Sequence, residues 1–353
     1  MATIDANIFR EYDIRGIVGR QLTDETVAVI GKAIGTYLRQ HGAKRIAIGF
    51  DARDSSPGFC KILTESLNAA GCDTVQIGMV PSPVLYHTLF TKDVDGGVMI
   101  TGSHNPPEHN GFKISLGTAS LFGDQIREIG EIALSESRPV WTSGGGQTDG
   151  ANEILDVLKD YHTDLVSRVE LGPRKLKAVI DAGNGMGGIT AVPIYQALDV
   201  DVVGLYTDPD PTFPNHHPDP SITENLTDLI KTVQQENADL GIAFDGDADR
   251  ITVVDETGRI IWGDELMILL SRDVLATHPE GIVIAEAKCS QTLFDDIENH
   301  GGVPLMWKAG HSIIKAKMKE TGAVLAGEMS GHIFFADRFY GFDDAAYAGS
   351  RVM

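Results

Sequence analysis

Three aspartates at alternate positions in DGDADR, residues 245–250, are the clearest sign of chemistry in the sequence. Because side chains alternate in extended backbone, Asp245, Asp247 and Asp249 are expected on one side of the chain. A predicted buried strand precedes them, and open α/β sheets bind ligands where strands end. Carboxylates this close repel one another unless a cation joins them. Oxygen ligands suit a hard ion, so the sequence predicts a Mg²⁺ site whose remaining negative charge Arg250 can offset.

Other interpretations fit parts of this segment. Glu256 stands at the twelfth place of an EF-hand loop, but Arg250 replaces the glycine required at the sixth place, and a strand precedes the loop. In an aspartyl-phosphatase-like site Asp245 would be the nucleophile, although the third aspartate and a separate serine loop argue against this. A solvated acidic turn is the third alternative, but such turns seldom follow a buried strand with strict alternation.

A serine stands in a rigid loop, TGSHNPPEHNGFK, at residues 101–113. The segment cannot continue as helix or central strand, because proline lacks the N–H group and fixes φ. Ser103 is therefore either an ordinary turn residue or a nucleophile held in place, with Lys113 at the far edge of the loop. A serine hydroxyl is a poor nucleophile, so catalysis would need a nearby base and charge neutralisation.

A third polar motif, GEMSGH at 327–332, places Glu328, Ser330 and His332 at alternate positions of a predicted strand-like run flanked by glycines. Glycine lets a ligand approach the backbone closely. A carboxylate and a hydroxyl suit sugar hydroxyls, and an imidazole suits phosphate or proton transfer. The polar face of an ordinary hairpin explains the pattern equally well. Single residues at strand or loop ends are lesser candidates: Arg15, Lys288 and, within KAGH, His311.

Two further patterns have competing structural explanations. GNGMGG at 183–188 matches the dinucleotide fingerprint G-x-G-x-x-G, with Asp208 where a ribose-binding acid would stand. An NAD-dependent dehydrogenase is therefore an alternative, although glycine-rich turns between strand and helix also occur for packing reasons. His216 and His217 look like metal ligands, but adjacent residues of an extended chain point in opposite directions, so we predict a structural loop.

Apolar β-type runs alternate with helical patterns along the chain, which predicts mostly parallel sheets with right-handed crossovers. In the first module, strand 45–51 precedes a helix N-capped by Ser56, and strand 111–115 is expected to be antiparallel. We predict an α/β protein of three successive mixed, mostly parallel sheet domains, with SGGGQTDG (143–150) as a flexible junction. The predicted domains are residues 1–150, which contain the serine loop, residues 151–258, which contain the three aspartates of the predicted metal site, and residues 259–353, which contain GEMSGH.

Composition limits the partners. The 353 residues carry a formal net charge of −21, which argues against nucleic acid and anionic membranes but permits a locally basic pocket for a phosphorylated substrate. No apolar run approaches the roughly 18–20 residues of a membrane span, and the first residues contain no signal-peptide core. Three scattered cysteines predict a reduced, cytoplasmic protein without structural disulfides. The sequence does not determine the oligomeric state.

Together, these motifs resemble those of the α-D-phosphohexomutases, in the phosphomannomutase/phosphoglucomutase branch. TGSHNPPEHNGFK resembles the phosphoserine loop of that family, DGDADR its metal loop and GEMSGH its sugar-recognition loop. YDIRG, VPSPVLY, FPNHHPDP and KAGHS also match, and the resemblance runs in order from about residue 8 to 348. GEMSGH in place of GEQSGH points to the mannose/glucose branch.

The resemblance implies reversible phosphoryl transfer between the 1- and 6-positions of a hexose phosphate (mannose and/or glucose), through a phosphoserine and a hexose 1,6-bisphosphate. Ser103 would hold the phosphoryl group and, with the three aspartates, bind Mg²⁺. The family has four domains and this chain is expected to stop after the third, so a poorly active form or a non-catalytic sugar-phosphate-binding fragment is an alternative. The further roles implied are phosphate contacts for Arg15, Lys113, Lys288 and Arg250, sugar contacts for Glu328 and Ser330, and proton transfer or phosphate contact for Lys113, His311 and His332.

Overall fold

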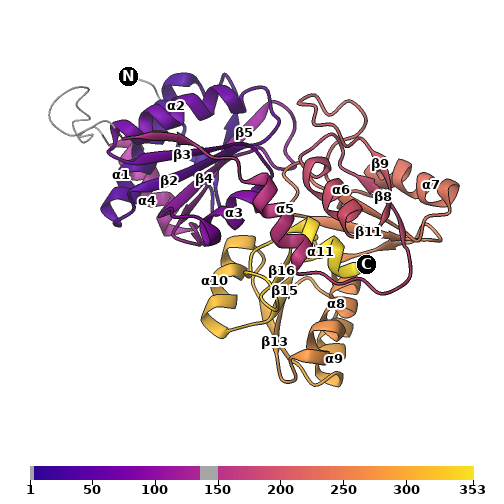
Figure 1. Ribbon diagram of the computed structural model, residues 1–353. Helices are drawn as coiled ribbons and strands as arrows, with labels where there is room; N and C mark the ends of the chain where they lie inside the picture. The colour runs from indigo at the N-terminus through magenta and orange to yellow at the C-terminus, as the bar shows by residue number, and fades with distance from the viewer. Residues whose placement is uncertain (1–3, 136–149) are drawn as a thin grey trace. The chain divides into compact units, whose positions relative to one another are not determined.

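The computed structural model describes residues 4–135 and 150–353, which form two compact units, Met1–Val157 and Leu158–Met353 (Figure 1). The junction predicted at 143–150 lies outside the described residues, apart from Gly150. Among the helices that the structure describes, none has the length and apolar character needed to cross a membrane.

The described residues of the first unit form a seven-stranded mixed sheet. Along the sheet the strands follow the order β1-β5-β4-β2-β3-β7, and β6 pairs with β5. Both neighbours of β2 run parallel to it, whereas β5 runs antiparallel to β4, as the sequence predicted. The strands are β1 (Ile14–Ile17), β2 (Arg45–Phe50), β3 (Asp73–Met79), β4 (Gly96–Ile100), β5 (His109–Leu116), β6 (Ala119–Ser120) and β7 (Asn152–Ile154).

Strand β7 pairs parallel with β3. The first sheet therefore takes in residues beyond 150, where the sequence analysis placed the end of the first domain. The sequence 152–154 is short and polar at two of its three positions, and its three residues are exposed, so it carries little strand signal of its own. Its pairing depends on the neighbouring edge of β3.

Helices α1 (Asp24–Gln40), α2 (Ser56–Ala69) and α4 (Asp124–Leu134) share one hydrophobic core with the first sheet, and α3 (Ser82–Thr91) contacts β2 and β4. A Cβ at Gly35 would lie 2.6 Å from the Cβ of Ala70, so glycine permits the close packing of α1 on α2. Ser56 is not the N-cap that the sequence predicted. Ser55 takes that position, because the Ser56 hydroxyl donates to the Asp51 carboxylate at 2.6 Å.

The second unit contains two sheets. The first has the order β12-β11-β10-β8-β9 and the second the order β14-β13-β15-β16. The strands are β8 (Lys177–Asp181), β9 (Asp201–Leu205), β10 (Leu240–Phe244), β11 (Ile251–Asp255), β12 (Ile260–Ile261), β13 (Ile282–Glu286), β14 (Val303–Trp307), β15 (Leu325–Gly327) and β16 (Ile333–Phe335). The helices are α5 (Leu158–Ser167), α6 (Gly188–Ala197), α7 (Thr227–Glu236), α8 (Gly263–Thr277), α9 (Gln291–Asn299), α10 (His311–Thr321) and α11 (Ala345–Val352).

All three sheets repeat one strand order. The sets β3-β2-β4-β5, β9-β8-β10-β11 and β14-β13-β15-β16 each contain three parallel strands followed by one antiparallel strand. Each candidate loop joins the third parallel strand to the antiparallel strand of its sheet. The predicted α/β fold with mixed, mostly parallel sheets is confirmed, and its topology gives the three loops equivalent places.

The last helix, α11, contacts both sheets of the second unit through β11 and β16 and also packs on α6 and α8 (Figure 1). The Tyr195 hydroxyl donates to the carbonyl of Ala346 at 3.0 Å. On α5, the Tyr161 hydroxyl donates to Asp344, the N-cap of α11, at 2.9 Å. These buried hydrogen bonds hold the two sheets of this unit together.

Replacing Tyr161 with Phe tests this link. Burial raises the pKa of Asp344 to about 7, and the Tyr161 hydroxyl is a buried donor to that carboxyl. Removing a buried hydrogen-bond partner costs about 1–3 kcal/mol, so Tyr161→Phe should lower the free energy of unfolding by that amount in urea denaturation. Tyr206→Phe is the control, because its hydroxyl bonds Asp228 in exposed surroundings. Equal effects of the two substitutions would contradict the buried link.

Candidate active site

Ser103 occupies a strained backbone conformation in the first unit. Its φ is +49°, in the left-handed region that serine rarely adopts. The Ser103 N–H group donates to Thr101 Oγ1 at 2.7 Å, and its Oγ lies 3.1 Å from His104 Nδ1. His104 is not among the predicted site residues, although its place beside the serine was an available signal. The side chain of Ser103 thus has a titratable neighbour, and its backbone is held by other groups.

The carbonyl groups of the serine loop converge on Arg53, a buried residue that the sequence analysis also missed. Its guanidinium group donates hydrogen bonds to four backbone carbonyls of the loop. Arg53 stands 50 residues before Ser103 in the chain. No motif near the serine could therefore have indicated it.

Two predicted cations lie in the same sheet as the serine loop. Arg15, on β1, donates to the carbonyl of Thr101 at 3.1 Å and pairs with Asp13. Lys113 is buried on β5, with its Nζ 3.4 Å from Ser82 Oγ. A Cβ at Gly111 would lie 2.1 Å from the carbonyl oxygen of Ile14, so the glycine of the motif is needed for β1 to pair with β5. Of these two cations, Arg15 directly contacts the start of the loop.

In the second unit, Asp245, Asp247 and Asp249 are fully buried, and each offers a carboxylate oxygen within 4.8 Å of the others. The sequence predicted extended backbone at these residues, but the chain forms a turn there. The Ala248 N–H group donates to the carbonyl of Asp245 at 3.1 Å, and Ala248 has φ +58°. The carboxylates converge because this turn curls the chain. Strand β10 precedes the turn, so the EF-hand alternative is not supported.

Arg250 pairs with the first aspartate. Asp245 Oδ2 accepts from Arg250 Nε at 3.1 Å, and Oδ1 accepts from the backbone N–H groups of Asp249 and Arg250 at 3.1 and 3.2 Å. Both oxygens of Asp245 thus have partners within the turn, which disfavours it as a nucleophile. Burial lowers the pKa of Arg250, but Asp245, Asp219 and Asp249 outweigh it and raise the pKa.

The donor set of this turn fits a divalent cation. Three buried carboxylates crowd this turn, with the guanidinium of Arg250 on Asp245 and the imidazole of His332 3.6 Å from Asp249. Uncompensated buried charge is costly, and hard cations prefer oxygen ligands. The cluster of aspartates can therefore hold a cation of that kind.

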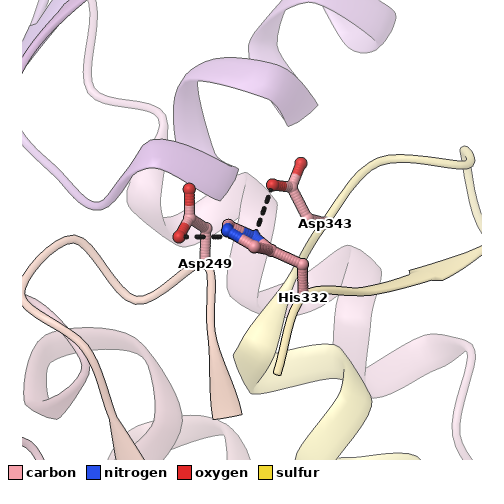
Figure 2. A group of neighbouring side chains, drawn as sticks. All are labelled: Asp249, His332 and Asp343. Atoms are coloured by element: carbon pink, nitrogen blue, oxygen red, sulfur yellow. Dashed lines mark ion pairs between the residues drawn. The ribbon is translucent and has the colours of Figure 1, made fainter. Parts of the chain in front are cut away.

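Beside the aspartates lies a second group, formed by Asp249, His332 and Asp343 (Figure 2). His332 Nδ1 is 3.0 Å from Asp343 Oδ2 and 3.6 Å from Asp249 Oδ1. Asp343 also pairs with Lys315 Nζ at 2.9 Å. His311 stacks on His332 with ring centroids 5.5 Å apart. Sequence reasoning did not find Asp343 or Lys315, which lie outside the three motifs.

Electrostatics favour the protonated form of His332. Burial lowers the pKa of His332, but Asp249 and Asp343 outweigh it and raise the pKa to about 9. Burial would raise the pKa of Asp343, yet Lys315 and the two histidines hold it well below its usual value. At neutral pH this group therefore contains an imidazolium beside two carboxylates when no cation is bound.

The hairpin that carries His332 joins the aspartate loop through the backbone. The N–H group of Ile251 donates to the carbonyl of Gly331 at 3.0 Å. Gly331 has φ +93°, and a Cβ there would lie 2.2 Å from the carbonyl oxygen of Ile251. This close approach explains the second glycine of GEMSGH, because any side chain would separate the two loops.

Residues 328–332 form a turn between β15 and β16, not the alternating strand that the sequence analysis described. The N–H group of Gly331 donates to the carbonyl of Glu328 at 3.0 Å. Buried Glu328 accepts from the Gly310 N–H group at 2.5 Å and from Ser330 Oγ at 3.3 Å. Burial raises the pKa of Glu328. Lys288 is exposed after β13, with its Nζ 3.5 Å from Glu286 Oε1.

The glycines of GNGMGG, between β8 and α6, pack against protein atoms. A Cβ would lie 1.9 Å from the carbonyl oxygen of Thr207 if placed on Gly188, and 2.8 Å from Gly246 Cα if placed on Gly185. The packing explanation is therefore favoured over the dinucleotide site. His216 lies 3.0 Å from Asp181 Oδ2 and has the structural role that the sequence predicted.

Protein-family models match the chain as three consecutive domains. Three family models match the chain, described as phosphoglucomutase/phosphomannomutase alpha/beta/alpha domain I at residues 6–139, domain II at 159–258 and domain III at 262–353. A phosphomannomutase/phosphoglucomutase of Pseudomonas aeruginosa is 46% identical over 351 residues, which are 99% of this chain and 74% of that protein. A phosphoglucomutase of Neisseria meningitidis is 44% identical and is covered over 75% of its length by the whole of this chain.

A solved structure indicates the same family as these sequence relatives. A crystal structure of a phosphoglucomutase/phosphomannomutase family protein from Burkholderia thailandensis has a TM-score of 0.94 and 42% identity, covering 99% of this chain and 76% of the other. The fold and sites define a mutase of the α-D-phosphohexomutase type, as the resemblance predicted. The chain belongs to the phosphoglucomutase/phosphomannomutase family.

The raised pKa of His332 predicts a pH-dependent stability. The folded state holds this proton up to about pH 9, whereas an unfolded histidine releases it near 6.5. The stabilisation is therefore present below pH 6.5 and is lost as pH rises through about 9, and it amounts to about 3 kcal/mol. Urea titrations without divalent cations should show a loss that is larger by about this amount in the parent than in His332→Gln.

The control is His278→Gln, at the carboxyl end of α8. It should retain the slope of the parent between pH 6.5 and 9. A parent profile that is flat over this range, or identical for the parent and His332→Gln, would show that the two carboxylates do not hold the imidazolium.

Proposed function

We propose that the chain catalyses reversible phosphoryl transfer between the 1- and 6-positions of mannose and/or glucose phosphate, with Ser103 as the carrier. Family membership supports the reaction class. The observation that carries the assignment is the equivalent place of the three loops, each at the end of the third parallel strand of its sheet. One loop supplies a hydroxyl, one a cation site and one sugar-type hydrogen-bonding groups.

The reaction has two balanced steps. In the first, the P–Oγ bond of phosphorylated Ser103 breaks and Oγ takes up a proton. At the same time a P–O bond forms to a free hydroxyl of the hexose phosphate, which releases its proton to a base. The product is a hexose 1,6-bisphosphate. In the second step the other sugar O–P bond breaks, its phosphoryl group passes to the Ser103 oxygen, which loses its proton to a base, and the sugar oxygen regains a proton. Hexose 1,6-bisphosphate added to the unphosphorylated protein would enter at the second step and activate it.

We assign proton transfer and phosphate contact to Lys113, His311 and His332. The imidazolium of His332 can donate a proton to a leaving oxygen and, in the reverse direction, accept it again, because Asp343 holds Nδ1 at 3.0 Å. Arg15 supports the serine loop through Thr101 and supplies positive charge. Charge neutralisation matters because phosphoryl transfer depends mainly on positioning and electrostatics.

Substrate binding is assigned to the second unit. Glu328 and Ser330 present acceptor and hydroxyl groups that suit the hydroxyls of a sugar. Arg250 and Lys288 supply cations for phosphate, Arg250 from a buried position and Lys288 from an exposed one. We retain the three predicted domain roles of phosphoserine, metal and sugar recognition. The cytoplasmic location inferred from the cysteine content stays a prediction.

Asp245, Asp247 and Asp249 would hold Mg²⁺, with an oxygen of phosphorylated Ser103 as a further ligand. The fit rests on three buried carboxylates whose oxygens lie within 4.8 Å of one another. When bound, the ion would neutralise charge on the phosphoryl group. The residues of this chain do the remaining work of binding, orientation and proton transfer.

Ser103→Ala tests the carrier role. The variant should acquire no phosphoryl group from glucose 1,6-bisphosphate in intact-mass measurements. Conversion of mannose 1-phosphate to mannose 6-phosphate, with Mg²⁺ and trace bisphosphate, should fall by at least about 1,000-fold. Ser167→Ala, an exposed serine of α5, is the control. Parent-like phosphorylation of Ser103→Ala would refute the assignment.

Asp247→Asn tests the cation site with two effects of opposite sign. Without divalent cations, removing one of three crowded carboxylates should raise the melting temperature, because like charges repel. In calorimetry, affinity for Mg²⁺ should fall at least about tenfold, which corresponds to about 1.4 kcal/mol. Asp201→Asn, exposed on β9, should change neither quantity. Unchanged Mg²⁺ affinity in Asp247→Asn would exclude this residue as a ligand.

A further inference from the structure

We propose that Arg53 is a positioning residue for phosphoryl transfer, which fixes the loop of Ser103 through its guanidinium group. The inference rests on the proposed role of Ser103 as the phosphoryl carrier. Arg53 is nearly inaccessible, with 1% of its surface exposed, and it does not belong to any of the three motifs. Its side chain touches backbone groups of the loop, not reacting atoms.

The five N–H groups of Arg53 have five acceptors. An arginine side chain carries five such donors in a planar fork. Nε donates to the Asp51 carboxylate at 3.2 Å. Each terminal nitrogen donates twice to loop carbonyls: Nη1 to Pro106 at 2.7 Å and His109 at 2.9 Å, and Nη2 to Ser103 at 2.9 Å and Asn105 at 2.6 Å.

Asp51 fixes the guanidinium and the loop together. Its Oδ2 accepts from Arg53 Nε and also from the N–H group of Gly102 at 3.0 Å. Its Oδ1 accepts from the hydroxyl of Ser56 at 2.6 Å, at the start of α2. Because Asp51 directly follows β2, its hydrogen bonds attach the loop to the central part of the sheet. The loop is therefore not held only by the strands at its two ends.

Gly102 leaves the space that the guanidinium occupies. A Cβ at this position would lie 2.2 Å from both Cζ and Nε of Arg53. A methyl group at 102 would therefore displace the guanidinium while leaving the arginine in the chain. The contact provides a second way to disturb the same anchor without removing its charge.

The anchor explains how Ser103 keeps an unfavourable backbone. A φ of +49° costs a serine about 1–3 kcal/mol and persists only where surrounding contacts impose it. Arg53 bonds the carbonyl of Ser103 itself and carbonyls two, three and six residues later. Displacing a reacting group by about 1 Å can cost 100-fold in rate, so loss of this anchor should affect transfer more than binding.

Lysine cannot replace this arginine, because it has three donors on one nitrogen and no planar fork. Arg53→Lys keeps the charge and should retain at most some of the carbonyl bonds. Arg45→Lys, on the neighbouring strand β2, is its matched control. Gly102→Ala is the second variant, and Gly58→Ala in α2 is its control, because a Cβ at Gly58 would meet no atom within 4 Å.

Three measurements on the full chain separate positioning from folding. We expect Arg53→Lys and Gly102→Ala to gain a phosphoryl group from glucose 1,6-bisphosphate at least about 100-fold more slowly, by intact mass. Affinity for glucose 1-phosphate in calorimetry should change less than about twofold, since the proposed sugar-binding residues lie in the other unit. Amide exchange at Asn105 and His109, whose N–H groups close turns within the loop, should accelerate while that of Ile48 in β2 does not.

Each outcome decides the inference. Phosphorylation rates within threefold of the parent in a folded Arg53→Lys would overturn it, as would slow phosphorylation with unchanged loop exchange. If Arg53→Lys does not fold, Gly102→Ala decides by the same criteria. Ser103→Ala separates the two proposals. If this variant is phosphorylated normally, the proposed function fails. If it is not phosphorylated but Arg53→Lys is phosphorylated at the rate of the parent, only the proposed role of Arg53 is overturned.

Discussion

A buried carboxylate follows or ends the central parallel strand of each sheet, and in two of the three sheets it accepts a hydrogen bond from the candidate loop. Asp51 follows β2 and accepts from the N–H group of Gly102, in the serine loop. Glu286 ends β13 and accepts from Met329, in the sugar-type loop, at 3.1 Å. Asp181 ends β8 and accepts from Gly183 at 2.9 Å while also pairing with His216. These carboxylates accept hydrogen bonds from backbone N–H groups that water would otherwise solvate. The loops that carry those N–H groups are therefore fixed relative to the sheet.

Charge balance is the second constraint on the molecule. With a net charge of −21, the chain nevertheless buries several carboxylates, and each described cluster has its own cations. Arg250 pairs with Asp245, and Lys315 with His332 surrounds Asp343. Three buried carboxylates within five residues distinguish the aspartate turn from the other clusters. A phosphate-transferring site benefits from this arrangement, because a bound cation changes the local field while the neighbouring ion pairs stay in place.

Local sequence patterns predicted many of the strands and turns of this protein, and particular elements show why. Apolar runs such as 45–50 and 240–244 are buried strands because both faces of a parallel sheet are covered. Prolines and glycines correctly ended elements around Ser103. The errors arose where contacts beyond the local pattern decide: Ser56 bonds Asp51 instead of capping α2, and two motifs expected to be extended are turns.

The sequence by itself determined the residue types of the site, their order and the strands that carry them, since these depend on local propensity and on burial patterns. It also determined the family through the motifs at Ser103, Asp245 and Glu328. Only the tertiary structure decided how the groups are held. Arg53 reaches the carbonyl of a residue 50 positions later, and His332 meets Asp249 and Asp343 from separate segments. Hydrogen bonds and ion pairs between distant segments form only when the sheets are assembled, so no local pattern could indicate them.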